Sequence, residues 1–240
     1  MESVWRKEIG KIEGKSKQVS GEANASPDIF RHEVIVVGAG LAGLLAAYYL
    51  QKAGLEVLVL EAKTVASGQT ERTTAKITSQ HGLKYDRLIK TVGHKKAWMY
   101  AKANEDAIRE YERLIREENI DCHFMRTSAY LYTTQSEELQ TGEKNDKIRN
   151  SIRLTSNVER LIREADAAKK LGIDAFFTRE TELPFKVTGA VCFRNQAQFN
   201  PLMFISHIAR ELRILENTKV IKIKGDKVYT ENKIFRAERI

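Results

Sequence analysis

The stretch Glu33–Glu61, EVIVVGAGLAGLLAAYYLQKAGLEVLVLE, decides the fold. Its first five residues are rich in β-branched side chains, which is typical of a buried strand. An apolar run from Leu41 to Ala53 predicts a helix, and Gly54 is a suitable residue to end it. A second apolar run, Glu56–Leu60, predicts another buried strand. Strand, helix and strand in this order form a βαβ unit, so we predict an α/β fold of the Rossmann-like kind.

Between the first strand and the helix lies the pattern Gly-x-Gly-x-x-Gly, at Gly38, Gly40 and Gly43. The first glycine makes a tight turn, the second lets the backbone approach a pyrophosphate, and the third lets the helix pack close to the strand. Free N–H groups at the start of the helix then bind phosphate. Glu61 ends the second strand, where a carboxylate accepts hydrogen bonds from ribose hydroxyls and repels a 2′-phosphate. The motif therefore predicts a dinucleotide site that disfavours NADP and leaves NAD and FAD open.

The segment after Glu61 bears on the choice between NAD and FAD. An NAD-dependent dehydrogenase would continue into a crossover helix and a third parallel strand within about 25 residues. The sequence instead has small and hydroxyl-bearing residues at Ser67-Gly68 and along Thr70–Thr78. Backbone N–H groups and hydroxyls of such a segment can wrap a large planar cofactor. We therefore favour a flavin and keep an NAD-dependent dehydrogenase as the alternative.

The rest of the chain has mixed helical and extended patterns. Amphipathic or capped patterns predict helices over 91–118, 158–171 and 201–212. Extended patterns predict a strand over 123–133, short extended pieces at 172–177, 183–185 and 189–193, and strands over 218–230 and 233–240, with turns near Gly225-Asp226 and Asn232. The first thirty residues lack sustained periodicity and predict an extended arm, on which Trp5 and Ile12 are the residues suited to docking. We predict three parts: the arm over 1–30, an incomplete cofactor domain over 31–82 and 201–240, and a substrate-domain portion over 83–200.

Composition narrows the class of protein further. The chain has 240 residues, an ordinary 42% of hydrophobic residues and a net charge of +8. Lysines and arginines are interspersed with acidic residues, so we predict no nucleic-acid partner. A basic interaction protein is a further alternative, but it leaves the glycine motif unexplained. No apolar run reaches membrane-spanning length. Two cysteines and the lack of a secretory signal favour the cytoplasm.

The motif sequences carry a family resemblance. VIVVGAGLAGLLAAYYLQKAGLEVLVLEA followed by SGQTERTTAKIT resembles the superfamily of FAD-dependent amino-acid oxidases and dehydrogenases, of the D-amino-acid oxidase and glycine oxidase type. MESVW, TTAKITSQHGL, ANEDAIREYERL, LPF, NQAQFNP and TKVIKIKGDKVYT are similar to a bacterial subgroup that often carries a C-terminal Rieske iron–sulfur domain. The glycine motif is generic to flavoproteins, whereas TERTTAKITSQHG together with NQAQFNP is far more specific.

This resemblance implies FAD as the cofactor and assigns residues to it. The pyrophosphate would lie on Gly38, Gly40, Leu41, Ala42 and Gly43, and the adenosine on Glu61, Ala62, Lys63 and the backbone of Val220. The ribityl chain and flavin would lie along Ser67, Gly68, Thr70, Arg72, Thr73, Thr74, Ala75, Lys76 and Ile77. The implied reaction is oxidation of a small amine or amino acid by hydride transfer to the flavin. We assign no catalytic residue.

The resemblance also implies that the family continues beyond Ile240. Further strands of both domains, and in the subgroup the Rieske domain, would follow, so we expect a C-terminally incomplete flavoprotein whose electron acceptor is missing. Cys122-His123 does not have the spacing of Rieske ligands, and we predict no metal site in this chain. A non-catalytic FAD-binding fragment is therefore a further alternative.

Overall fold

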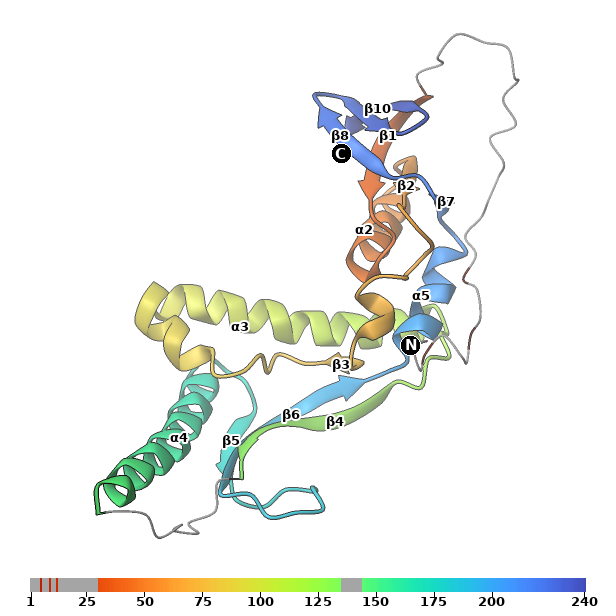
Figure 1. The fold of residues 1–240 in the computed structure, drawn as a ribbon. Coiled ribbons are helices and arrows are strands. Elements are labelled where there is room, and N and C mark those ends of the chain that lie inside the picture. Colours follow the sequence, from red (N-terminus) through yellow and green to blue (C-terminus); the bar gives the residue numbers. More distant parts are fainter. Residues whose placement is uncertain (1–4, 6–8, 10–11, 13–29, 135–143) are drawn as a thin grey trace. The chain divides into compact units, whose positions relative to one another are not determined.

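The computed structural model describes residues 5, 9, 12, 30–134 and 144–240, and it divides the chain into two compact units (Figure 1). The first unit comprises Met1–Ala75, Asn119–His123 and Asn200–Ile240. The second unit comprises Lys76–Glu118 and Phe124–Phe199. Each unit is therefore built from separate segments, and the chain passes between them several times.

The first unit is built on a six-stranded sheet with the order β7-β2-β1-β10-β9-β8. Its strands are β1 (Phe30–Val37), β2 (Val57–Leu60), β7 (Arg213–Leu215), β8 (Val220–Lys224), β9 (Lys227–Thr230) and β10 (Ile234–Arg239). The four strands β7, β2, β1 and β10 are parallel, whereas β9 and β8 continue the sheet antiparallel. All four residues of β2 are buried, as expected for a strand inside a parallel sheet.

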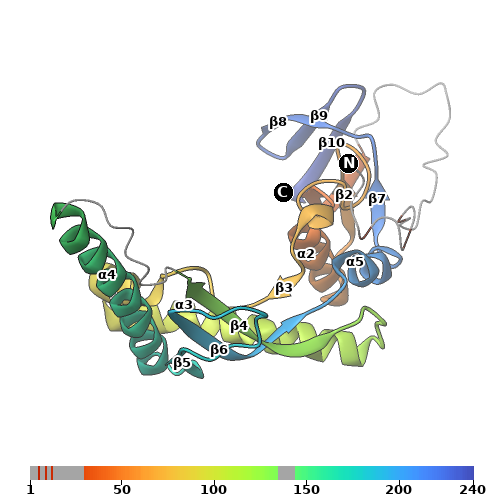
Figure 2. The same cartoon turned by 60° about the horizontal axis from the view of Figure 1, so that its bottom comes forward.

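Two helices of this unit, α2 (Leu41–Lys52) and α5 (Pro201–Ala209), lie side by side (Figure 2). Helix α2 follows β1 through the glycine turn and buries Leu44, Ala47 and Tyr48. Helix α5 begins where the sequence predicts, because the Asn200 side chain accepts hydrogen bonds from the N–H groups of Leu202 and Met203, both at 3.1 Å. A short 3-10 helix, η1 (Thr70–Arg72), lies in the segment after β2.

The second unit contains a four-stranded antiparallel sheet. Its strands are β3 (Lys76–Ile77), β4 (Met125–Thr133), β5 (Ala175–Thr178) and β6 (Gly189–Gln198), and β6 pairs with all three others. Two long helices, α3 (Tyr85–Glu117) and α4 (Lys144–Lys170), pack with this sheet around a core that includes Ala97, Leu161 and Phe193. Helix α3 bends at Gly93, whose φ of 80° interrupts the helical backbone.

The predicted α/β fold is confirmed, and most predicted elements exist, but several limits were wrong. Helix α3 begins at Tyr85 rather than at 91, and α4 begins at Lys144 rather than at 158. The predicted turn near Gly225-Asp226 is confirmed: Gly225 has a positive φ there, and the turn divides the segment 218–230 into the two strands β8 and β9. The short strand β7 was not predicted. The extended N-terminal arm is contradicted at Trp5 and Ile9, which are helical; residues 1–4, 6–8, 10–11 and 13–29 lie outside the described residues.

The buried His32 in β1 gives the first unit a predicted sensitivity to acid. Its side chain is 6% exposed, and its Nδ1 lies 3.4 Å from Oε1 of Glu56. Burial lowers the pKa of His32 below its ordinary value of about 6.5, although the neighbouring Glu56 opposes this shift. The unfolded chain therefore takes up a proton more readily than the folded chain. The free energy of unfolding is expected to fall as the pH drops below the ordinary imidazole pKa.

Urea unfolding at about pH 7.5 and about pH 5.5 measures this contribution. The free energy of unfolding should decrease less between these two pH values in His32→Gln than in the parent chain, because the amide does not titrate. His81→Gln is the matched control, since His81 is exposed. An acid dependence that is identical in all three chains would contradict the assignment to His32.

Candidate cofactor-binding site

The turn between β1 and α2 requires glycine at two positions. Gly38 has a φ of 102°, in the left-handed region that side chains rarely adopt, and its N–H donates to the carbonyl of Leu60 at 2.8 Å. At Gly43, an added Cβ would lie 2.0 Å from the carbonyl oxygen of Gly38. Gly40 has more room, since the nearest atom to an added Cβ would be Oγ1 of Thr70 at 3.4 Å. The start of α2 is thus packed as closely against the end of β1 as backbone atoms allow.

The first turn of α2 presents backbone N–H groups. The N–H of Leu41 donates to Oγ1 of Thr70 at 3.0 Å, and Thr70 is buried. Within the described ranges, the N–H groups of Ala42 and Gly43 have no hydrogen-bond partner in the protein. Because these groups carry the positive end of the helix dipole, they form a suitable binding place for an anion such as phosphate.

Glu61, directly after β2, is fixed by the glycine turn and by its own loop. Its Oε2 accepts a hydrogen bond from the N–H of Ala39 at 2.7 Å, and its Oε1 accepts one from the N–H of Lys63 at 2.8 Å. Each carboxylate oxygen retains acceptor capacity beyond these bonds. The structure therefore holds the half-buried Glu61 next to the glycine turn.

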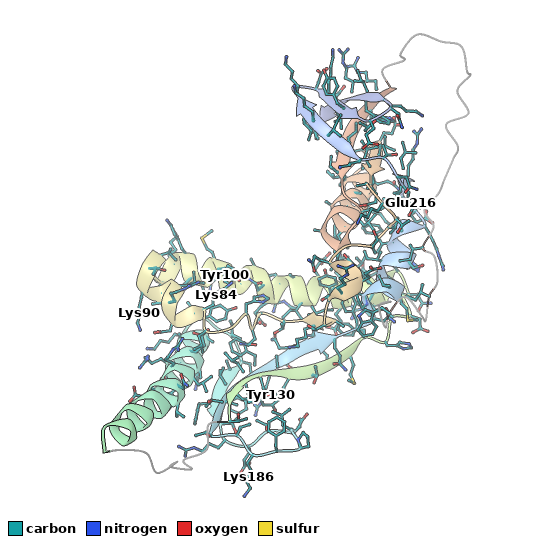
Figure 3. All side chains as sticks on the ribbon, viewed as in Figure 1. Lys84, Lys90, Tyr100, Tyr130, Lys186 and Glu216 are labelled. Carbon is teal, nitrogen blue, oxygen red and sulfur yellow. The ribbon has the colours of Figure 1, made fainter. Side chains whose placement is uncertain are left out.

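The loop after Glu61 is held by residues that lie about 150 positions away in the sequence. The N–H of Val65 donates to Oε1 of Glu216 at 2.7 Å, and the N–H of Asn217 donates to the carbonyl of Lys63 at 2.9 Å. Figure 3 labels Glu216 in the first unit. Glu216 could not be predicted from the sequence, because no local pattern reveals a hydrogen-bond partner about 150 residues away.

The segment 66–75 contains two non-glycine residues in the left-handed region, Ala66 with φ 61° and Ala75 with φ 63°. Both are buried, and the N–H of Ala66 donates to the carbonyl of Ala39 at 3.0 Å. Such conformations are uncommon outside glycine and are held by the surrounding structure. Among the predicted cofactor residues here, Gly68, Arg72 and Thr74 are exposed, and Ser67 and Thr73 are half-buried.

The structure brings together the predicted residues Gly38 to Gly43, Glu61 and Thr70 through the contacts above. Ala62 and Lys63 follow Glu61 on the same loop and are exposed. Val220 begins β8 in the same unit, opposite Thr230, and its side chain packs against the buried cluster that contains Ile35. Lys76 and Ile77 form β3 of the second unit, where they pair with Gln198 and Ala197.

The strand order bears on the NAD alternative. A third parallel strand shortly after Glu61 is absent from the described residues, since β3 pairs antiparallel in the other sheet. The strand that lies beside β2 is β7, from residues 213–215. The chain therefore leaves the sheet of the first unit after the first βαβ unit and returns to it much later.

The described residues also bear on disulfides, metal sites and membrane-spanning helices. Cys122 and Cys192 are buried and form no disulfide, and no group of three or more His, Cys, Asp or Glu residues in the described ranges is placed to hold a metal ion. None of the described helices combines the length and apolar character needed to cross a membrane.

Three comparisons with known proteins address the family. The family model described as "DAO: FAD dependent oxidoreductase" matches residues 33–239. The YhfW protein of Bacillus subtilis (strain 168), whose name describes a Rieske 2Fe-2S iron-sulfur protein, is 32% identical over 197 residues, which are 80% of this chain and 35% of that protein. The gamma-glutamylputrescine oxidoreductase of Escherichia coli (strain K12) is 28% identical over 112 residues, or 47% of this chain and 26% of that protein.

Solved structures share the fold at low sequence identity. The L-proline dehydrogenase from P. horikoshii has a TM-score of 0.61 at 17% identity, covering 88% of this chain and 53% of that one. The glycine oxidase from Bacillus cereus ATCC 14579 has a TM-score of 0.58 at 19% identity, covering 86% and 53%. The chain thus spans about a third of YhfW and about half of these structures. Because the family model matches residues 33–239, well over half of the chain, the protein belongs to the DAO family of FAD-dependent oxidoreductases.

Proposed function

We propose that the first unit binds FAD and that the protein oxidises a small amine or amino acid. The observation that carries this proposal is the coupling of the glycine turn to Glu61, whose Oε2 lies 2.7 Å from the N–H of Ala39. One arrangement thereby provides both a phosphate-binding helix start and a carboxylate for a ribose. The family to which the chain belongs uses FAD, which supports the choice of dinucleotide.

The residues fit an FAD molecule. Gly38 and Gly40 carry no side chain where a pyrophosphate would approach, and the N–H groups of Ala42 and Gly43 are available to it. We assign pyrophosphate binding to Gly38, Gly40, Leu41, Ala42 and Gly43. Adenosine binding is assigned to Glu61, Ala62, Lys63 and the backbone of Val220.

The flavin side is assigned to the segment that follows. We propose that Ser67, Gly68, Thr70, Arg72, Thr73, Thr74, Ala75, Lys76 and Ile77 lie along the ribityl chain and the ring. Bound FAD supplies a two-electron acceptor, here for a hydride from a carbon next to nitrogen. The chain's own residues bind and orient the cofactor, and the exposed Arg72 supplies positive charge.

The substrate proposal rests on the relatives. Gamma-glutamylputrescine oxidoreductase, L-proline dehydrogenase and glycine oxidase are named for substrates that are amines or amino acids. We propose the same class here, with the second unit as the substrate-binding part. YhfW is named for a Rieske centre, so we propose such a centre as the electron acceptor. A cytoplasmic location stays a prediction.

The visible absorption spectrum of the purified 240-residue chain tests the cofactor, before and after denaturation releases any bound ligand. A flavin spectrum with FAD in the released fraction is expected. A chain that stays colourless after added FAD, while a longer polypeptide spanning the relatives' full length also stays colourless, would overturn the proposal. Turnover of amines by the coloured chain separates an active enzyme from a non-catalytic FAD-binding fragment.

Substitution of Glu61 tests the assigned ribose contact. Glu61→Ala is expected to weaken FAD binding by roughly 10- to 100-fold, the range for hydrogen bonds to a charged group. Glu61→Gln retains one acceptor oxygen and should lose less. Equilibrium dialysis against FAD gives the dissociation constants. Glu231→Ala is the control, because it removes an exposed carboxylate from the same unit with the same change in net charge. Equal affinity in all four chains would refute the contact.

A further inference from the structure

A contact from the N-terminal region reaches the segment assigned to the flavin. The indole Nε1–H of Trp5 donates a hydrogen bond to the carbonyl oxygen of Thr73 at 3.1 Å, across 68 residues of sequence. Trp5 is half-buried in this position. The described residues nearby support a docked segment, since Trp5 and Ile9 are helical and Ile12 is only 2% exposed.

Thr73 lies where the backbone changes from the 3-10 helix η1 to an extended conformation. It ends η1 and turns the chain into an extended conformation, with φ −69° and ψ 154°. Its Oγ1 also accepts a hydrogen bond from the N–H of Ala75 at 3.3 Å, and Ala75 holds the left-handed φ of 63°. A carbonyl fixed at Thr73 therefore helps to fix the backbone from Thr73 to Ala75.

The segment is thus held from two sides. At its beginning, Ala66 donates to the carbonyl of Ala39, and the hydroxyl of Thr70 accepts from Leu41 at the start of α2. At its end, the Trp5 indole holds Thr73. The first set of contacts is local to the glycine turn, whereas the second depends on residues that precede β1.

We infer that Trp5 is a positioning residue for FAD, which anchors the flavin-side segment through the Thr73 carbonyl. This inference rests on the proposed function. Because an ordered segment costs less conformational entropy to bind than a loose one, the docked indole strengthens FAD binding. By linkage, bound FAD strengthens the docking of Trp5 to the same extent.

The first test needs no cofactor. Hydrogen–deuterium exchange is compared between the parent chain and the variants Trp5→Phe, Trp5→Ala and Trp98→Phe. Trp5→Phe keeps an aromatic ring and removes only the indole N–H, so a folding failure of the alanine variant does not stop the test. Peptides within 66–75 should exchange faster in both Trp5 variants, most of all in Trp5→Ala. Trp98→Phe is the matched control, since Trp98 is the other tryptophan and lies 43% exposed in the second unit.

The second test measures the dissociation constant of FAD for the same four chains. Trp5→Phe is expected to weaken FAD binding by about fivefold, which corresponds to one ordinary hydrogen bond. Trp98→Phe should bind FAD like the parent chain. If the parent binds FAD and Trp5→Phe binds it equally well, the inference is overturned while the proposed function stands. If neither the parent nor the longer polypeptide binds FAD, the proposed function fails and the positioning role fails with it. If only the longer polypeptide binds FAD, the same variants are compared in that polypeptide with the same expected outcomes. If hydrogen–deuterium exchange within 66–75 were the same in the Trp5 variants as in the parent chain, this result alone would overturn the anchoring role of Trp5.

Discussion

Replacement of Gly43 by alanine is expected to abolish FAD binding and to lower the free energy of unfolding by about 2 kcal/mol or more. The added Cβ would lie 2.0 Å from the carbonyl oxygen of Gly38, 3.2 Å from its carbonyl carbon and 3.5 Å from Cγ1 of Val36. Two of these three neighbours are backbone atoms, which no rotamer change can move. The start of α2 must therefore shift away from β1.

That shift disturbs everything attached to the first turn of α2. Leu44 and Ala47 are fully buried on this helix, so its displacement opens gaps in a closely packed core. The N–H groups assigned to the pyrophosphate move with the helix, and so does the N–H of Leu41 that donates to Thr70. Stability and cofactor binding should consequently fall together.

Urea unfolding followed by circular dichroism measures the stability, and equilibrium dialysis against FAD measures the binding. Gly68→Ala is the stability control, because an added Cβ there meets nothing within 4 Å and φ lies outside the left-handed region. It should unfold at nearly the same urea concentration as the parent chain. A Gly43→Ala chain that unfolds like the parent and binds FAD normally would contradict the close packing of α2 on β1.

The parts of the fold that could be predicted depend on contacts between residues close in sequence. The glycine turn, α2 and β2 are determined within the stretch 33–61, so the motif alone predicts them. Helix α5 was predicted for the same reason, because Asn200 caps the N–H groups of its own first turn. In both places the residue recognised in the sequence, a motif glycine or Asn200, also makes the local contact that forms the turn or caps the helix.

The parts that could not be predicted depend on partners far away along the chain. The three-residue strand β7 exists because Leu58 to Leu60 pair with it, and nothing in 213–215 itself requires a strand. Glu216 and Trp5 act on the candidate site across 151 and 68 residues, respectively. The sequence shows a carboxylate at Glu216 and an indole at Trp5, but it does not show which backbone group each side chain hydrogen-bonds.

The start of α3 is the clearest example, because its cap comes from another helix. Lys84 occupies the N-cap position and makes no side-chain cap. Instead, Glu164 of α4 accepts hydrogen bonds at Oε1 from the N–H groups of Lys84 and Tyr85, at 2.7 and 2.8 Å. Its Oε2 accepts from Asp86 at 3.0 Å. No Ser, Thr, Asp or Asn marks position 84, which explains why the predicted helix began too late.

Replacement of Glu164 by alanine should therefore destabilise the second unit strongly, by roughly 3 kcal/mol or more. Glu164 is 0% exposed, so its removal leaves the N–H groups of Lys84, Tyr85 and Asp86 without this acceptor and leaves a buried space in the second unit. The substitution also removes a negative charge from the positive end of the α3 dipole. A loss of this size is a large share of the stability of an ordinary domain.

Thermal and urea unfolding of three variants test this cap. Glu164→Gln keeps one acceptor oxygen for two of the N–H groups but presents a donor to the third, so its loss should be intermediate. Glu159→Ala is the matched control on the same helix, because Glu159 is exposed and pairs with Arg163 one turn later, at 3.7 Å. Such a surface pair contributes about 0.5 kcal/mol or less. If Glu164→Ala proved no more harmful than Glu159→Ala, the three hydrogen bonds would not be what holds the start of α3, and the kink at Gly93 would become the natural boundary of that helix.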